Sequence, residues 1–192
     1  MCSAPYARRV SFTVRRLLPL VPAGLLLAAC SSASGTPRVA VPSPTGAAAA
    51  ACRDLAEALP DRVEGRARAE LDVAGPYVAA WGDPAIVLRC GVPRPERLTP
   101  GSESYDPAAD TVTVNEVSWL LEEQPDGIRF TTTERAVFVE VTVPGDYAPE
   151  VNPLLDLAAP VAAHIPLDEL HAQAEQDERD QAGERTEGRA GD

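Results

Sequence analysis

Few residues of this chain have both the type and the spacing that catalysis requires. No G-x-S-x-G turn is present to expose a nucleophilic serine. The two histidines, His164 and His171, stand two helical turns apart with Asp168 and Glu169 between them, side chains of the kind that bind Zn²⁺. We favour a simpler interpretation, in which His164 ends a helix and the others are solvated residues of a polar tail. These positions lead us to expect no catalytic residue, no metal ligand and no cofactor.

A loop rich in proline and acidic residues, Pro93–Asp110, contains oxygen ligands of the kind that Ca²⁺ prefers. Glu103, Asp106 and Asp110 lie along it, but their spacing matches no dedicated calcium-binding loop. We expect a solvated acidic loop here rather than a metal site.

Carboxylates on predicted strands raise the possibility of glycosidase chemistry, which needs two of them facing each other across a sugar. The candidates are Glu116, Glu122, Glu123 and Glu140. Glu122 and Glu123 are adjacent in sequence and therefore point to opposite faces of a strand, which argues against them as a couple. Surface glutamates are expected on an antiparallel sheet in any case. A carboxylate-dependent cell-wall hydrolase is therefore the alternative function, not the leading one.

One set of polar and aromatic residues is the candidate for ligand binding. It consists of Trp81, Asp83, Arg89, Asn115 and Trp119. On an open face of a sheet, such side chains hold a sugar or a peptide by stacking and hydrogen bonds. The more conservative interpretation is structural: both tryptophans fill the core or a turn, and Arg89 pairs with Glu140 across strands.

Two cysteines, Cys52 and Cys90, remain once Cys2 is removed with the signal and Cys30 carries the lipid, and such a pair in an oxidising compartment predicts a structural disulfide. In the predicted helix Ala47–Leu59, Cys52 lies on the inward stripe with Leu55 and Leu59. In the predicted strand Ala85–Val92, alternation places Cys90 on the inward face. Both side chains therefore point into one interior, which favours a bond between helix and sheet over a redox-active pair of C-x-x-C type.

The N-terminus reads as an export signal that ends at a lipidated cysteine. Four arginines precede an apolar stretch, Leu17–Ala29, that is too short to span a bilayer. Its end, Leu27-Ala28-Ala29-Cys30, resembles the lipobox of bacterial lipoproteins. We expect residues 1–29 to be a signal peptide, Cys30 to carry the lipid, and residues 30–46 to form a flexible tether rich in Ser, Pro and Thr.

The rest of the chain, up to about residue 170, predicts one domain with an antiparallel sheet of about four strands. Besides Ala85–Val92, runs of alternating apolar residues cover Thr111–Glu123, 128–132 and 136–143. The alternation slips by one residue at Asn115–Glu116, which we interpret as a β-bulge.

A second helix follows the predicted strands. Asn152 is the expected cap and Pro153 the first helical residue, and Pro160 is expected to kink the helix. Its predicted buried stripe is Leu154, Leu155, Ala158, Val161 and Ile165. The element order indicates an α+β fold with both helices on one face of the sheet. Residues 171–192 form an acidic, polar tail, either a frayed helix or disordered.

Several motifs together resemble one known family. They are the lipobox signal, Cys52-Arg53-Asp54-Leu55, Trp81-Gly82-Asp83-Pro84, Leu88-Arg89-Cys90-Gly91-Val92-Pro93, Trp119-Leu120, Val139-Glu140-Val141-Thr142-Val143-Pro144 and Tyr147-Ala148-Pro149. The family is the uncharacterised actinobacterial lipoproteins grouped as DUF3515, and the similarity covers roughly residues 47–166. This resemblance implies no activity, ligand or catalytic residue.

The charge balance narrows the range of partners. The chain has a net charge of −12, and an acidic domain has no cationic patch with which to bind nucleic acid. We therefore expect a non-catalytic binding or assembly module, held by its lipid on the extracytoplasmic face of the cell membrane. Its expected partner is a cell-wall component or another exported protein.

Overall fold

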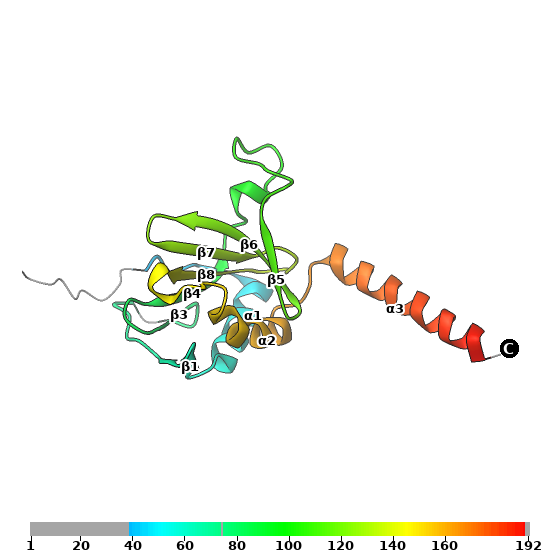
Figure 1. Ribbon diagram of the computed structural model, residues 1–192, viewed down its shortest axis with the longest axis horizontal. Coiled ribbons are helices and arrows are strands. Elements are labelled where there is room, and N and C mark those ends of the chain that lie inside the picture. The colour runs from blue at the N-terminus through cyan, green and yellow to red at the C-terminus, as the bar shows by residue number, and fades with distance from the viewer. Residues whose placement is uncertain (1–38, 74, 191–192) are drawn as a thin grey trace, which may run out of the picture. The chain divides into compact units, whose positions relative to one another are not determined.

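The computed structural model describes residues 39–73 and 75–190 (Figure 1). The expected signal peptide, Cys30 and most of the tether lie outside these residues. The helices are α1 (Gly46–Ala58), α2 (Pro153–His164) and α3 (Glu169–Ala190). The strands are β1 (Arg62–Val63), β2 (Arg66–Ala67), β3 (Val78–Trp81), β4 (Ile86–Val92), β5 (Thr111–Val114), β6 (Val117–Gln124), β7 (Gly127–Thr132) and β8 (Phe138–Pro144).

The main sheet is antiparallel and has six strands in the order β3-β4-β8-β7-β6-β5. Helices α1 and α2 contact each other and pack on one face of this sheet (Figure 1). The predicted α+β class with antiparallel strands is therefore confirmed. Strands β1 and β2 form a separate two-stranded hairpin.

The prediction of about four strands was wrong, first because Thr111–Glu123 is two strands rather than one. The expected bulge at Asn115–Glu116 is a turn, and Asn115 has the positive φ of 52° that such a turn uses. Val114 pairs with Val117 across it. Residues opposite each other in an antiparallel pair point to the same face, so Val114 and Val117 both face inward. They are three positions apart in the sequence, so the turn between them looks like a shift of one position in the alternation of a single strand.

The sequence also concealed strand β3, at the edge of the sheet. Its residues Ala79, Ala80 and Trp81 are all buried, so it lacks the alternation of apolar and polar residues by which a half-exposed strand is recognised. The hairpin β1–β2 is too short to show a pattern at all.

Helix α2 buries a stripe in which Leu157 takes the place of the predicted Leu155. Leu154, Leu157, Ala158 and Val161 are fully buried, whereas Leu155 is 58% exposed. Positions i, i+3, i+4 and i+7 share one face, and Leu155 lies about 100° around the axis from Leu154. The side chain of Asn152 makes no capping hydrogen bond, because the turn before it already supplies carbonyl acceptors to the first helical amides.

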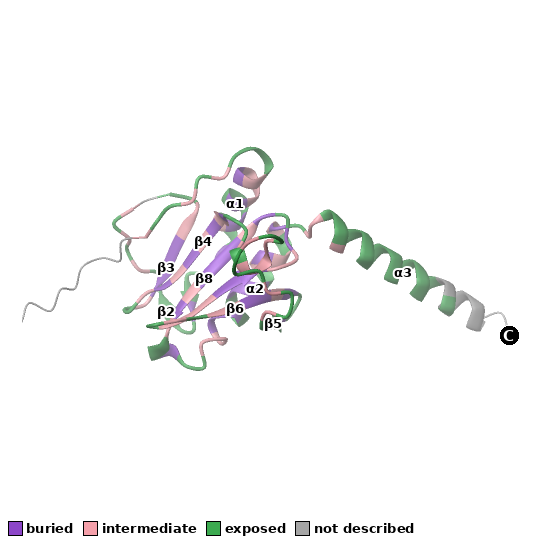
Figure 2. Ribbon diagram, turned by 90° about the horizontal axis from the view of Figure 1, so that it is seen from above, coloured by how far each residue is buried: buried purple, intermediate pink, exposed green. Residues whose placement is uncertain are grey.

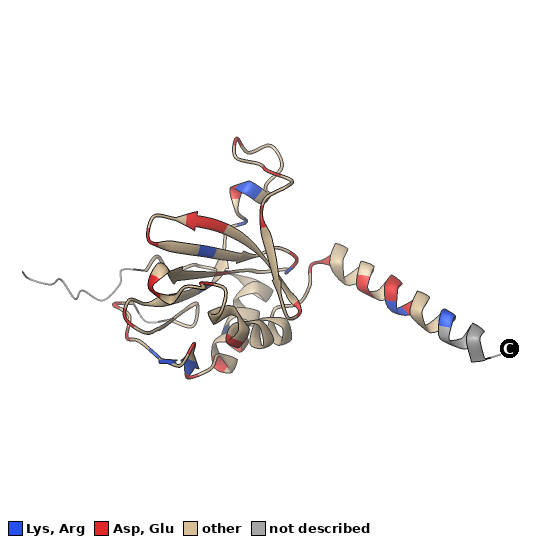
Figure 3. Ribbon diagram, viewed as in Figure 1, with Lys and Arg blue, Asp and Glu red and all other residues tan. Residues whose placement is uncertain are grey.

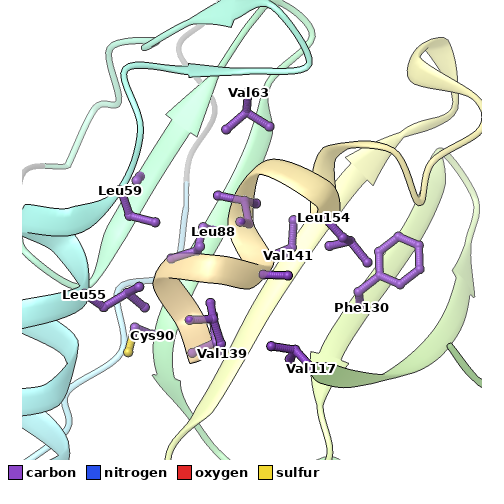
Figure 4. Close-up of a cluster of buried hydrophobic side chains, with 14 of the residues drawn as sticks. Leu55, Leu59, Val63, Leu88, Cys90, Val117, Phe130, Val139, Val141 and Leu154 are labelled. Carbon is purple, nitrogen blue, oxygen red and sulfur yellow. The ribbon is translucent and has the colours of Figure 1, made fainter. Parts of the chain in front are cut away.

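The predicted disulfide is confirmed. Cys52 of α1 and Cys90 of β4 are bonded, with their Cα atoms 5.6 Å apart, and both are buried. Figure 4 shows Cys90 beside Leu55, among the leucines and valines that fill the space between the helices and the sheet. The bond joins the first helix to the second strand of the sheet and thereby closes one end of the core.

The C-terminal residues form helix α3, whose described side chains are almost all exposed and mostly polar (Figure 2). Asp168 precedes it and accepts hydrogen bonds from the backbone amide of His171 at 3.0 Å and pairs with its ring at 2.6 Å. Among residues 39–73 and 75–190, no helix has the length and apolarity needed to cross a membrane.

Candidate functional site

The polar side chains of the sheet gather on the face opposite the two helices. Residues 139, 141 and 143 of β8 are buried valines, so the alternating positions Glu140 and Thr142 point the other way. Arg89 of β4 lies directly opposite Glu140, and Arg129 of β7 lies opposite Thr142. Figure 3 shows the basic segment of β7 beside an acidic segment of β6.

Arg89 and Glu140 form the central ion pair of this face. Nε and Nη2 of Arg89 donate to the two carboxylate oxygens of Glu140, each at 2.8 Å. Glu140 is only 7% exposed and has little access to water, so the bidentate pair with Arg89 supplies hydrogen bonds to both of its carboxylate oxygens. The sequence analysis gave two interpretations of Arg89, a ligand-binding residue or a partner of Glu140 across strands. The structure contains the pairing with Glu140.

Two further ion pairs flank the first. Arg129 donates from Nε to Oε2 of Glu122 at 3.1 Å, across β7 and β6. Arg97 donates from Nη2 to Oδ2 of Asp106 at 2.7 Å, which pins the loop between β4 and β5. The hydrogen bond from Arg97 holds the pKa of Asp106 below its usual value, helped by the backbone amide of Ala108.

Apart from Asp106, the residues of these three ion pairs line two adjoining hollows, of about 430 and 320 Å³, that share Arg89, Arg129 and Glu140. We call the two together the open-face groove. The residues that line it are Val39, Ala40, Val87, Arg89, Val92, Pro93, Pro95, Glu96, Arg97, Ser104, Glu122, Gln124, Arg129, Thr131, Glu140 and Thr142. Its volume suits a few residues of peptide or a small saccharide.

The two walls of the open-face groove come from segments outside the sheet. The loop between β4 and β5 forms one wall, with Pro95 and Ser104. The start of the described chain forms the other, where the carbonyl of Ala40 accepts from Nη1 of Arg89 at 3.2 Å. A Cβ at Gly91 would lie 2.7 Å from Pro44, so glycine at this bulged position lets the N-terminal segment lie against the sheet.

Of the five site residues suggested by sequence, the structure places only Arg89 in the open-face groove. Trp81 and Trp119 are fully buried, and Trp81 donates from Nε1 to the carbonyl of Pro60 at 3.0 Å. Asp83 lies in the turn between β3 and β4, and Asn115 lies in the turn between β5 and β6. The five therefore do not converge on one site.

The groove residues that lie on strands β6, β7 and β8 could have been found from the sequence. Once the valines of β8 are assigned to the core, Glu140 and Thr142 must face outward, and the same rule exposes Arg129 and Glu122 on neighbouring strands. What the sequence did not reveal is the contribution of Arg97 and Ser104, because they come from a loop with no periodic pattern.

Two of the residues considered as metal ligands, Asp106 and Asp168, are hydrogen-bonded to other side chains. Within the described ranges, no three His, Cys, Asp or Glu side chains converge to hold a metal ion. Asp106, a candidate calcium ligand, is taken up by Arg97. Partial burial raises the pKa of Asp168, but its hydrogen bonds from the backbone and ring of His171 outweigh that effect and leave the pKa lowered.

The chain matches the model of one protein family over residues 17–170, and that family is described as a protein of unknown function, DUF3515. No curated protein and no solved structure matches the chain significantly.

Proposed function

The chain belongs to the DUF3515 family, and we propose that it is a non-catalytic binding module, lipid-anchored through Cys30 on the outer face of the cytoplasmic membrane. Its recognition surface is the open-face groove. The observation that carries the proposal is the groove itself, a polar hollow on a rigid sheet whose carboxylates are held by arginines.

The groove favours recognition because its polar groups are fixed in place before a ligand arrives. Arg89 and Glu140 orient each other on β4 and β8, and Arg129 and Glu122 do the same on the neighbouring strands β7 and β6. A ligand with hydroxyl, amide or charged groups meets an ordered set of donors and acceptors, so little side-chain entropy is lost on binding. This chemistry suits a peptide or saccharide of the cell wall, or a loop of another exported protein.

The alternative, a carboxylate-dependent hydrolase, draws support from one fact: Glu122 and Glu140 line the same hollow. Against it, both oxygens of Glu140 accept from Arg89 and the side chain is only 7% exposed, so Glu140 is engaged in a buried ion pair rather than directed at a substrate. A hydrolase predicts soluble fragments released from purified cell wall, abolished in Glu140→Gln. The binding module predicts association with its partner and no release of fragments.

The anchor would keep the groove near the membrane. Val39, on the groove wall, follows Cys30 by nine residues, and an extended chain spans at most about 3.5 Å per residue. The wall at Val39 therefore lies within about 30 Å of the lipid. The partner must accordingly be present close to the outer surface of the membrane.

Photo-crosslinking in intact cells tests this proposal. A photo-reactive residue at Ser104, on the groove wall, should capture a defined partner, whereas the same residue at Leu155, exposed on α2 on the other side of the sheet, should not. Changing Cys30→Ala should reduce the Ser104 crosslink, because the groove is no longer held at the membrane. Equal capture from both positions, or none from Ser104, would contradict the assignment of the groove.

A further inference from the structure

The two edges of the six-stranded sheet differ in how their outward backbone groups are satisfied. At β3, the carbonyl of Ala80 accepts from Ala69 at 2.9 Å, and the amide of Gly82 donates to Ala67 at 3.0 Å, so the chain itself covers this edge. At the other edge, β5 has no such neighbour among the described residues.

The register of β5 identifies which of its groups are unpaired. Leu121 donates to the carbonyl of Asp110 at 2.8 Å, which makes Asp110 and Leu121 a hydrogen-bonded pair. In an antiparallel ladder such pairs alternate, so Val112 and Val114 bond to β6 while Thr111 and Thr113 turn their amides and carbonyls outward. In the described part of the chain these four groups have no partner.

Strand β5 is short, at four residues, but it lacks the other features that usually protect a free edge. It contains no proline, no charged residue and no bulge in its pairing with β6. Its two threonines are exposed, and Val112 and Val114 are directed to the core side. An edge of this kind is a template for strand addition, in which backbone hydrogen bonds supply affinity and alternate side chains supply specificity.

The charges beside the edge indicate what would pair with it. Asp110 and Glu116 are exposed acids at the two ends of β5, and residues 107–117 contain no basic side chain. The nearby cation at the Glu116 end is Arg135, which is 7% exposed and donates to the backbone carbonyl of Glu116. A second copy of this chain would bring the same acids to the same edge, together with another net charge of −12. A segment with basic residues at its ends would instead be attracted to both acids.

We infer that the β5 edge binds an extended segment of another polypeptide, with alternating β-branched residues and lysine or arginine at its ends. This interaction surface is separate from the open-face groove and does not depend on the function proposed for it. The added strand would extend the main sheet to seven strands.

The probe for this inference is an acetylated and amidated peptide, KRTVTVTRK, added to the purified protein. Amide hydrogen exchange should slow at least about tenfold at Thr111 and Thr113, which gain partners, and change little at Val112, which already bonds to β6. The matched peptide with glutamate in place of lysine and arginine should bind at least about tenfold more weakly.

Substitutions at the edge separate backbone pairing from side-chain contact. Thr113→Pro removes one outward amide and leaves the bonds between β5 and β6 intact, so binding should weaken at least about tenfold. Thr113→Val keeps the amide and should bind within about threefold of the wild type. If Thr113→Pro does not fold, a probe N-methylated at alternate residues removes the same bonds from the peptide side and should also fail to bind.

Three results would overturn the inference. The first is unchanged exchange at both threonines with millimolar probe, and the second is equal binding of the basic and acidic peptides. The third is a dimer in sedimentation equilibrium that Thr113→Pro abolishes, because that result assigns the edge to a second copy of this chain.

Discussion

At the scale of single residues, the structure depends on a few buried polar groups that are matched to one another. Glu140 is 7% exposed and Arg135 is 7% exposed. The guanidinium of Arg135 donates hydrogen bonds to backbone carbonyls, including that of Ile165 at 3.1 Å. The carboxylate of Glu140 instead accepts its hydrogen bonds from Arg89. A buried carboxylate that loses its partner still carries the free-energy penalty of desolvation, but it no longer gains the favourable interaction with the opposite charge.

We expect this dependence to appear in a double-mutant cycle. Arg89→Met should lower the free energy of unfolding by about 2 kcal/mol, less than for a fully buried pair because the Arg89 side chain is 25% exposed. Adding Glu140→Met should restore about half of that loss or more, because no unpaired charge remains. Chemical denaturation of the four proteins measures the cycle, and strictly additive losses would show that the two side chains do not interact.

At the scale of elements, the helix α1 is fastened to the sheet by one covalent bond as well as by packing. Cys52 and Cys90 are 38 positions apart, so their bond closes a loop that includes β1, β2 and β3. Such a closure restricts the unfolded chain, and the cost of removing it follows from the length of the loop.

The variant Cys52→Ala/Cys90→Ala should therefore lose about 4 kcal/mol of unfolding free energy. Denaturant midpoints of the oxidised wild type and the double variant measure the difference, and the reduced wild type is the control, since it lacks the bond but keeps both side chains. A loss below about 1 kcal/mol would mean that packing alone holds α1 in place.

Elements with a strong period were predictable from sequence, and those without one were not. The alternating valines of β8 and the inward stripe of α1 gave correct predictions of that strand, the first helix and the disulfide. Strand β3 was missed because both its faces are covered, and β5 was merged with β6 because a two-residue turn preserves the facing of its neighbours. Tryptophans were overvalued as ligand-binding residues, since Trp81 and Trp119 fill the core.

At the scale of the whole molecule, the chain combines a folded domain with an N-terminal segment that we propose to be an export signal and lipid anchor. The domain has a polar groove on one side of its sheet and two helices on the other, and Val39 and Ala40 form part of the groove wall. On the proposal made above, a short stretch of chain would link the anchor at Cys30 to the open-face groove. The net charge of −12 is the reason that we expect no binding to nucleic acid.

The most direct test is the intact mass of the protein isolated from the cells that make it. We expect a chain that begins at Cys30, carries a diacylglycerol on that sulfur, and is recovered with the membranes. A chain that still begins at Met1, bears no acyl group and is recovered from the cytosol would contradict the account.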